Sequence, residues 1–163
     1  MPQRDYIYNL HGSGTTASNI FQTAAGYSDY EIDFGTPVTG TASPYITVFP
    51  SSTEKGYTLP AEAVGNGGVE FGVHLVIGTA VSGGSITTGT VNVTSSAASA
   101  STAVIASRVL SNAQLGQAGG HYFVSVPQMA VLEFLRCEFV PTTGNAGAGT
   151  GFAWYGPKTG GES

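Results

Sequence analysis

Residues 69–77 read Val69-Glu70-Phe71-Gly72-Val73-His74-Leu75-Val76-Ile77. Every odd-numbered position in this stretch is apolar, whereas most even-numbered positions are small or polar. Because successive side chains of a strand point to opposite faces of a sheet, this period of two predicts a half-buried β-strand. The turn residues Gly65-Asn66-Gly67-Gly68 come before it and Gly83-Gly84 come after it, so both ends of the strand are bounded.

Short segments of the same kind recur along the chain. Residues 86–94 place Val91 and Val93 on one face and predict an antiparallel hairpin with 69–77. Further strands are expected at 29–34, 45–49, 53–59, 102–106, 122–126, 131–139 and 151–155, with one helical turn over 111–115. No apolar stripe at helical spacing appears. Strands at this spacing predict an all-β sandwich or barrel.

The 163 residues have the length of one domain. Residues 1–26 show no clear strand or helix period and are interpreted as an N-terminal arm. The aromatic residues Tyr6, Tyr8 and Phe21 favour an arm that docks on a partner over a solvated tail. Residues 27–156 are assigned to the β domain, and residues 157–163 to a loose C-terminal tail.

Charged residues make up only 9% of the chain, against about a quarter of an ordinary soluble domain. Such a surface has weak electrostatic repulsion, which is easier to explain if neighbouring subunits cover part of it. The alternative is a free, threonine-rich domain. The net charge is −5 and the five cations are scattered, so neither nucleic acid nor an anionic membrane is an expected partner.

The sequence lacks the residue patterns of common catalytic and metal sites. It contains no HxH, HExxH, Cys-x-x-Cys or GxSxG motif. His74 stands alone on its strand and is read as a polar residue, and Cys137 as a small buried hydrophobe. The alternating carboxylates Asp29, Glu31 and Asp33 could bind a cation, but a solvated strand face is favoured. We therefore predict no enzyme, no metal and no cofactor.

Four groups of residues together resemble a known family of phage proteins. They are Ser28 to Gly35 with its Ile32-Asp33-Phe34-Gly35 ending; the glycine-rich turn 65–68 with the strand 69–77; Leu110 to Leu115 with Ala118-Gly119 and Tyr122 to Pro127; and Phe134-Leu135-Arg136 before Thr142-Thr143-Gly144 and Gly149-Thr150. In these residues the chain is similar to the capsid cementing (head-decoration) proteins of short-tailed phages, the Bordetella-phage type.

The resemblance implies a jelly-roll β-sandwich of about eight antiparallel strands, here with an extended N-terminal arm. It implies a structural protein on the outer surface of the virion, made in the bacterial cytoplasm. Its partners would be the major capsid protein and further copies of itself, a dimer being favoured and a trimer possible. The expected contact residues are Arg4, Tyr6, Tyr8, Asn66, Gly67 and Tyr155.

A second hypothesis is a carbohydrate-binding jelly-roll module of a tail fibre or lectin-like protein. Trp154, Tyr155 and Tyr122 could stack on a sugar ring if they lined a concave face. Because Trp154 and Tyr155 alternate along a strand, one is expected in the core and the other at the surface.

Overall fold

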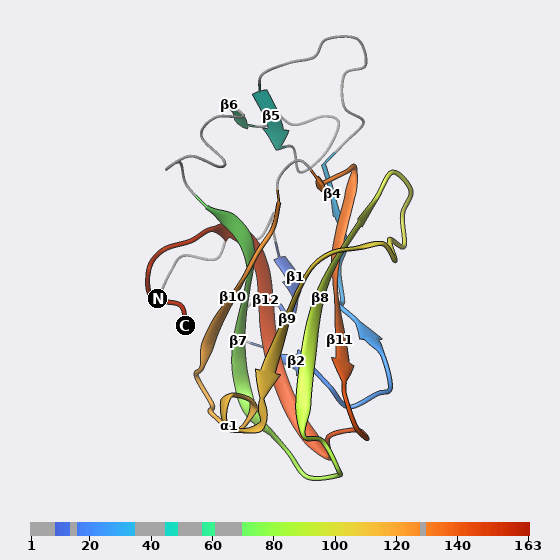
Figure 1. Ribbon diagram of the computed structural model, residues 1–163, viewed down its shortest axis with the longest axis vertical. Coiled ribbons are helices and arrows are strands. Elements are labelled where there is room, and N and C mark those ends of the chain that lie inside the picture. Colours follow the sequence, from blue (N-terminus) through green and yellow to red (C-terminus); the bar gives the residue numbers. More distant parts are fainter. Residues whose placement is uncertain (1–8, 14–15, 35–44, 49–56, 61–69, 128–129) are drawn as a thin grey trace.

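The computed structural model describes residues 9–13, 16–34, 45–48, 57–60, 70–127 and 130–163. Over these residues the chain forms two antiparallel sheets that lie face to face (Figure 1). The fold is therefore all-β, as the sequence predicts. The one helix among the described residues, α1 (Asn112–Leu115), begins with a capping box between Ser111 and Gln114 and confirms the expected helical turn.

Each large sheet has five strands. The first sheet has the order β1 (Asn9–His11), β12 (Ala148–Pro157), β7 (Phe71–Ser82) and β10 (His121–Ser125), with β2 (Ser18–Asn19) also paired to β12. The second has the order β3 (Gly26–Tyr27), β11 (Phe134–Pro141), β8 (Thr88–Ser96) and β9 (Val104–Ser111), with β4 (Ile32–Asp33) also paired to β11. A separate antiparallel pair joins β5 (Tyr45–Val48) and β6 (Tyr57–Pro60).

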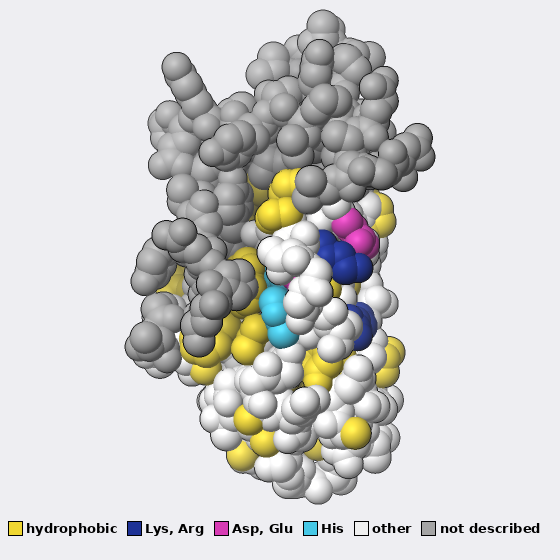
Figure 2. Space-filling model, turned by 90° about the vertical axis from the view of Figure 1, so that its left-hand side faces the viewer, with side chains coloured by type: hydrophobic (Ala, Val, Ile, Leu, Met, Phe, Trp, Pro, Cys, Tyr) yellow, Lys and Arg dark blue, Asp and Glu magenta, His cyan; other side chains and the backbone are white. Residues whose placement is uncertain are grey.

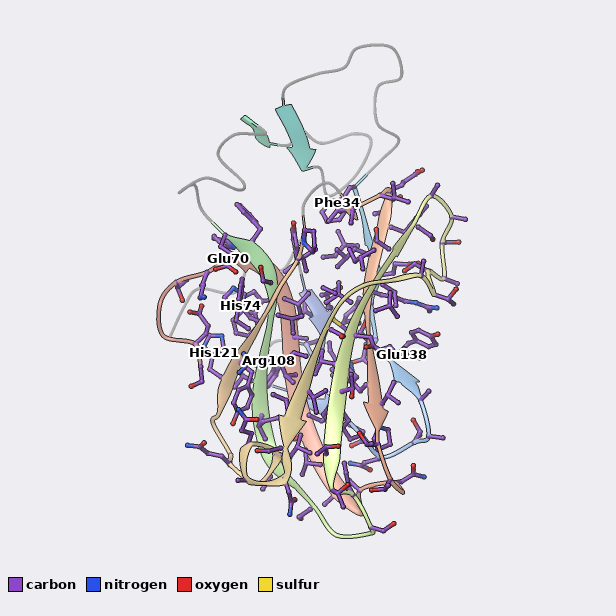
Figure 3. All side chains as sticks on the ribbon, viewed as in Figure 1. Phe34, Glu70, His74, Arg108, His121 and Glu138 are labelled. Carbon is purple, nitrogen blue, oxygen red and sulfur yellow. The ribbon has the colours of Figure 1, made fainter. Side chains whose placement is uncertain are left out.

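The core lies between the two large sheets, where the side chains meet in Figure 3. On β7 the odd-numbered residues Val73, Leu75 and Ile77 face this core and are completely buried, as the alternation predicts. Alternate residues of β8 and β11, among them Val93 and Cys137, close it from the other side. Burying each aliphatic side chain of this size contributes about 1.5–3 kcal/mol, so the alternating pattern supplies the main force that holds the sheets together.

The hairpin predicted between 69–77 and 86–94 is wrong. Strand β7 pairs with β10 and β12, whereas β8 pairs with β9 and β11 in the other sheet. Gly83 and Gly84, with φ of 75° and 61°, turn the chain from the first sheet to the second. The hairpin that does form joins β8 to β9, which continues well beyond the strand expected at 102–106.

Much of the segment interpreted as an N-terminal arm belongs to the sandwich. Strand β1 pairs with β12, β2 pairs with β12, and β3 pairs with β11. Leu10, Ile20 and Phe21 are buried in the core. Strands β1, β2 and β3 are two or three residues long, too short for a periodic pattern to reveal them.

The C-terminal tail also differs from the loose segment expected. The Ser163 amide donates to the His121 carbonyl at 2.9 Å, and the Lys158 amide donates to the Glu70 carbonyl at 2.7 Å. Lys158 and Glu70 also form an ion pair at 3.1 Å between half-exposed side chains. Residues 158–163 therefore lie against the outer face of the first sheet.

Candidate functional site

Five of the expected contact residues, Arg4, Tyr6, Tyr8, Asn66 and Gly67, lie outside the described residues. The sixth, Tyr155, is a core residue. Only 2% of its surface is exposed, and its ring packs against Phe34 and Phe71 with centroid distances of 5.6 and 6.0 Å. The structure thus corrects the expectation that Tyr155 contacts a partner.

The rings expected to stack on a sugar are all buried. Tyr122 faces the core and donates its hydroxyl to the Gln114 carbonyl at 2.9 Å. Trp154 lies on the opposite face of the first sheet and stacks on His74 with a centroid distance of 5.0 Å and an interplanar angle of 4°. Neither ring, nor Tyr155, offers an exposed stacking surface in this structure.

The carboxylates of 29–34 serve separate local roles. Glu31 accepts hydrogen bonds from the backbone N–H groups of Ala100 and Ser101 at 2.8 and 2.9 Å, which holds the loop before β9. Asp29 accepts a hydrogen bond from the Gly12 N–H at 3.0 Å. Gly12 belongs to the segment after β1, which is distant in sequence from the loop that Glu31 holds. These two carboxylates therefore stabilise the backbone of two different loops.

The outer face of the first sheet carries a cluster of His74, His121 and Glu162, which we name the His–Glu cluster. The Nδ1 atom of His74 lies 3.0 Å from Nε2 of His121 and 3.2 Å from Oε1 of Glu162. The ligand atoms of all three lie within 4.8 Å of one another. Figure 3 shows His74 and His121 on neighbouring strands, β7 and β10, at one side of the sandwich.

The ring of His74 is fixed by its other nitrogen. Nε2 lies 2.9 Å from the carbonyl oxygen of Pro157, and a carbonyl can only accept. Nε2 therefore carries the proton, which leaves Nδ1 with a lone pair in the neutral ring. The indole ring of Trp154 stacks in parallel on one face of the His74 ring and helps to hold it in this orientation.

Glu162 is fixed just as firmly. Its Oε1 accepts from the Thr159 N–H at 2.9 Å and the Thr159 hydroxyl at 2.6 Å, and its Oε2 accepts from the Gly160 N–H at 2.7 Å. The side chain is fully covered. Burial opposes ionisation, but these hydrogen bonds outweigh it and lower the pKa of Glu162 to about 2. The cluster therefore contains a carboxylate anion at neutral pH.

Both histidines of the cluster favour the neutral form. Burial lowers the pKa of His74, and the neighbouring His121 lowers it further, while the Pro157 carbonyl and Glu162 oppose the shift. Burial also lowers the pKa of His121, with Glu162 opposing. Two neutral imidazoles and one carboxylate are a set of nitrogen and oxygen donors that suits a transition-metal ion.

Sequence reasoning missed this cluster because its members come from three distant segments. The pattern of 69–77 correctly placed His74 on the face away from the core. It could not show that β10 pairs beside β7, nor that the tail folds back over both strands. The available signal was the polar residue His74 on the face of the strand away from the core.

A second surface feature is the free edge of β9, which we name the β9 edge. Strand β9 pairs with β8 and ends the order of the second sheet. Val104 and Val109 on this strand are 52% and 59% exposed, the largest fractions among the exposed large hydrophobic side chains of the described residues. The edge thus combines the outer side of a terminal strand with exposed apolar side chains.

No helix among the described residues has the length and apolar character needed to cross a bilayer. Comparison with protein-family models and with curated proteins finds no match for the sequence. The function is therefore inferred from the sandwich, the β9 edge and the His–Glu cluster.

Proposed function

We propose that this chain is a structural virion protein that binds the outer surface of a phage capsid and cements its major capsid protein subunits. The observation that carries the proposal is the β9 edge on a sandwich whose sequence is only 9% charged. Further copies of the chain are proposed as partners beside the major capsid protein. A dimer is favoured and a trimer is the alternative.

The order of strand pairing supports a jelly roll as the finer description of the fold. Four antiparallel pairs are nested one inside the next along the chain: β1 with β12, β3 with β11, β7 with β10, and β8 with β9. Successive pairs fall alternately in the first and the second sheet. A long double strand rolled up in this way gives the two-sheet arrangement of jelly rolls, which are common in viral capsid domains.

The chemistry of the β9 edge fits a protein partner. Free strands of soluble proteins are usually protected by charged side chains that prevent association. The only charged residue in β9 is Arg108, and its Nη1 donates to the Phe123 carbonyl of β10 at 2.8 Å and to the Ser163 carbonyl at 2.5 Å. The Arg108 side chain is thus bound to β10 and the tail. The exposed large side chains of the β9 edge are therefore the apolar Val104 and Val109.

An icosahedral lattice suits an interface of this kind. Each β9 edge is eight residues long and would contribute only a small contact. Repetition over many sites raises the overall affinity far above that of one contact, because neighbouring attachments are held at high effective concentration. A rigid sandwich with modest contacts can therefore strengthen a shell.

Cryo-electron microscopy of the virus particles whose genome carries this sequence tests the proposal. We expect density for the sandwich on the outside of the head, bridging major capsid protein subunits. Particles assembled without this chain should lose that density and release their DNA at a lower temperature. Density confined to the tail or to the head interior, or absence of the chain from purified virions, would contradict the proposal.

A further inference from the structure

The His–Glu cluster places three lone-pair donors around one point. Because Nε2 of His74 carries its proton toward the Pro157 carbonyl, Nδ1 faces the cluster as an acceptor. The carboxylate Oε1 of Glu162 lies 3.2 Å from this nitrogen and is also an acceptor. A proton on Nε2 of His121 can satisfy Nδ1 of His74, but it leaves the contact between His74 and Glu162 as two acceptors facing each other.

We propose that His74, His121 and Glu162 bind one divalent transition-metal ion, with Zn²⁺ as the best match. A cation among these atoms turns the unfavourable contact between acceptors into three coordinate bonds. The ligands are Nδ1 of His74, Nε2 of His121 and a carboxylate oxygen of Glu162. This inference is independent of the proposed role on the capsid.

The spacing of the donors fits a tetrahedral ion. Zinc bonds to imidazole nitrogen at about 2.0–2.1 Å, so two ligands of a tetrahedral site are about 3.3–3.4 Å apart. The two distances from Nδ1 of His74 are 3.0 and 3.2 Å. These two distances need an adjustment of only a few tenths of an ångström. The ligand atoms of all three residues lie within 4.8 Å of one another, so the partly exposed His121 and Glu162 must close by up to about 1.4 Å to complete the geometry. Imidazole ligands also distinguish the site from those of Ca²⁺ and Mg²⁺, which prefer oxygen.

The surroundings orient the ligands as they do in known metal sites. A histidine ligand usually donates its second ring N–H to a carbonyl or carboxylate, which fixes the tautomer. The Pro157 carbonyl does this for His74. Thr159 and Gly160 hold both oxygens of Glu162 through three donated hydrogen bonds. Two of the three ligands are thus preorganised by the tail itself.

The site has an access route and a structural consequence. His121 is partly exposed, and Figure 2 shows a histidine ring (cyan) at the surface of the face it views. An ion can therefore enter from solvent. Its three protein ligands come from β7, β10 and the tail, so the bound ion ties residues 157–163 across the outer face of the first sheet. A fourth position remains open to water or a side chain of a partner.

Calorimetric titration of the untagged, full-length, metal-stripped chain with ZnCl₂ tests the site. We expect one ion per chain with micromolar or tighter affinity, and visible absorption bands of tetrahedral coordination when Co²⁺ replaces Zn²⁺. Zinc should also raise the unfolding temperature by several degrees, since an ion that binds only the folded state stabilises it.

Single substitutions assign the ligands. Glu162→Gln and His121→Gln should each weaken zinc binding at least tenfold and abolish the cobalt bands. Glu138→Gln is the matched control, because Glu138 accepts a hydrogen bond from Asn92 on the second sheet and should leave binding unchanged. Near-ultraviolet circular dichroism verifies that each variant is folded. Absence of saturable binding by the wild-type chain below millimolar zinc, or wild-type affinity in either ligand variant, would overturn the inference.

Discussion

His11 is a buried imidazole whose neutral form the fold requires. Its Nδ1 accepts the Asp29 N–H at 3.2 Å, so Nε2 carries the proton and donates to the Asn19 carbonyl at 3.0 Å. Burial lowers the pKa of His11 below 6.5, although Asp29, whose Oδ2 lies 3.4 Å from Nδ1, opposes the shift. The folded state therefore binds fewer protons than the unfolded state, and stability should fall as the pH drops below about 6.5.

The variant His11→Gln should be less stable than the wild type at pH 8, by about 1–2 kcal/mol, because one hydrogen bond is lost. The difference in unfolding free energy between the wild type and the variant should become smaller at pH 5.5. The wild type loses stability there because unfolded His11 binds a proton, whereas glutamine does not titrate. Urea unfolding in the presence of EDTA at both pH values measures this gap. His74 and His121 titrate in both proteins and therefore cancel in the difference. A gap that is constant with pH would contradict the assignment of a neutral, buried His11.

Gly84 and Gly119 both have a left-handed backbone, but only at Gly84 would an added Cβ be crowded. Comparing alanine substitutions at the two positions therefore distinguishes the cost of backbone strain from the cost of steric crowding. Gly84 and Gly119 have φ of 61° and 81°. A Cβ added at Gly84 would lie 1.9 Å from the Asn145 carbonyl oxygen, whereas one at Gly119 would meet nothing within 4 Å. Gly119→Ala should cost about 1 kcal/mol of unfolding free energy, and Gly84→Ala about 1–3 kcal/mol more. Equal losses in urea unfolding would show that the turn at Gly84 relaxes freely.

At the scale of elements, the short N-terminal strands give the clearest test of the sandwich. Leu10 on β1 is completely buried against the core. Leu10→Ala should lower the unfolding free energy by about 2–5 kcal/mol, the usual cost of a cavity in a packed core. The exposed Val104 provides a control, since Val104→Ala should change stability by less than about 0.5 kcal/mol. A negligible loss for Leu10→Ala would mean that this segment is an arm after all.

The success of the sequence predictions depended on element length. Strand β7, with 12 residues, shows its alternation clearly, and β10 and β12 were also located from their aromatic and β-branched residues. Strands β1 and β2, with three and two residues, carry no readable period. The pairing of β7 was mispredicted because neighbouring strands usually pair, and no local signal shows that Gly83 and Gly84 send the chain to the other sheet.

For the whole molecule, the pairing scheme explains why the site could not be predicted. Strand β1 pairs with β12, so the described beginning of the chain lies against its end. On its other side β12 pairs with β7, and the tail that follows β12 bonds to Glu70 and His121 and completes the His–Glu cluster. Contacts this distant in sequence depend on the full topology rather than on local pattern. They also require the closing of large loops, which makes folding slow compared with a helical protein of this length.

The β9 edge of the second sheet is apolar, and its role can be tested on the intact molecule. Val109 on the β9 edge is 59% exposed, and Tyr30, between β3 and β4 at the opposite end of the second sheet, is 48% exposed. We expect Val109→Lys to weaken self-association in sedimentation velocity, and occupancy on phage heads, at least tenfold, because a lysine protects a strand edge from pairing. Tyr30→Lys adds the same charge at the opposite end of the second sheet and should leave both quantities unchanged. If the two variants behave alike, net charge rather than the β9 edge controls assembly, and the interface must lie elsewhere on the sandwich.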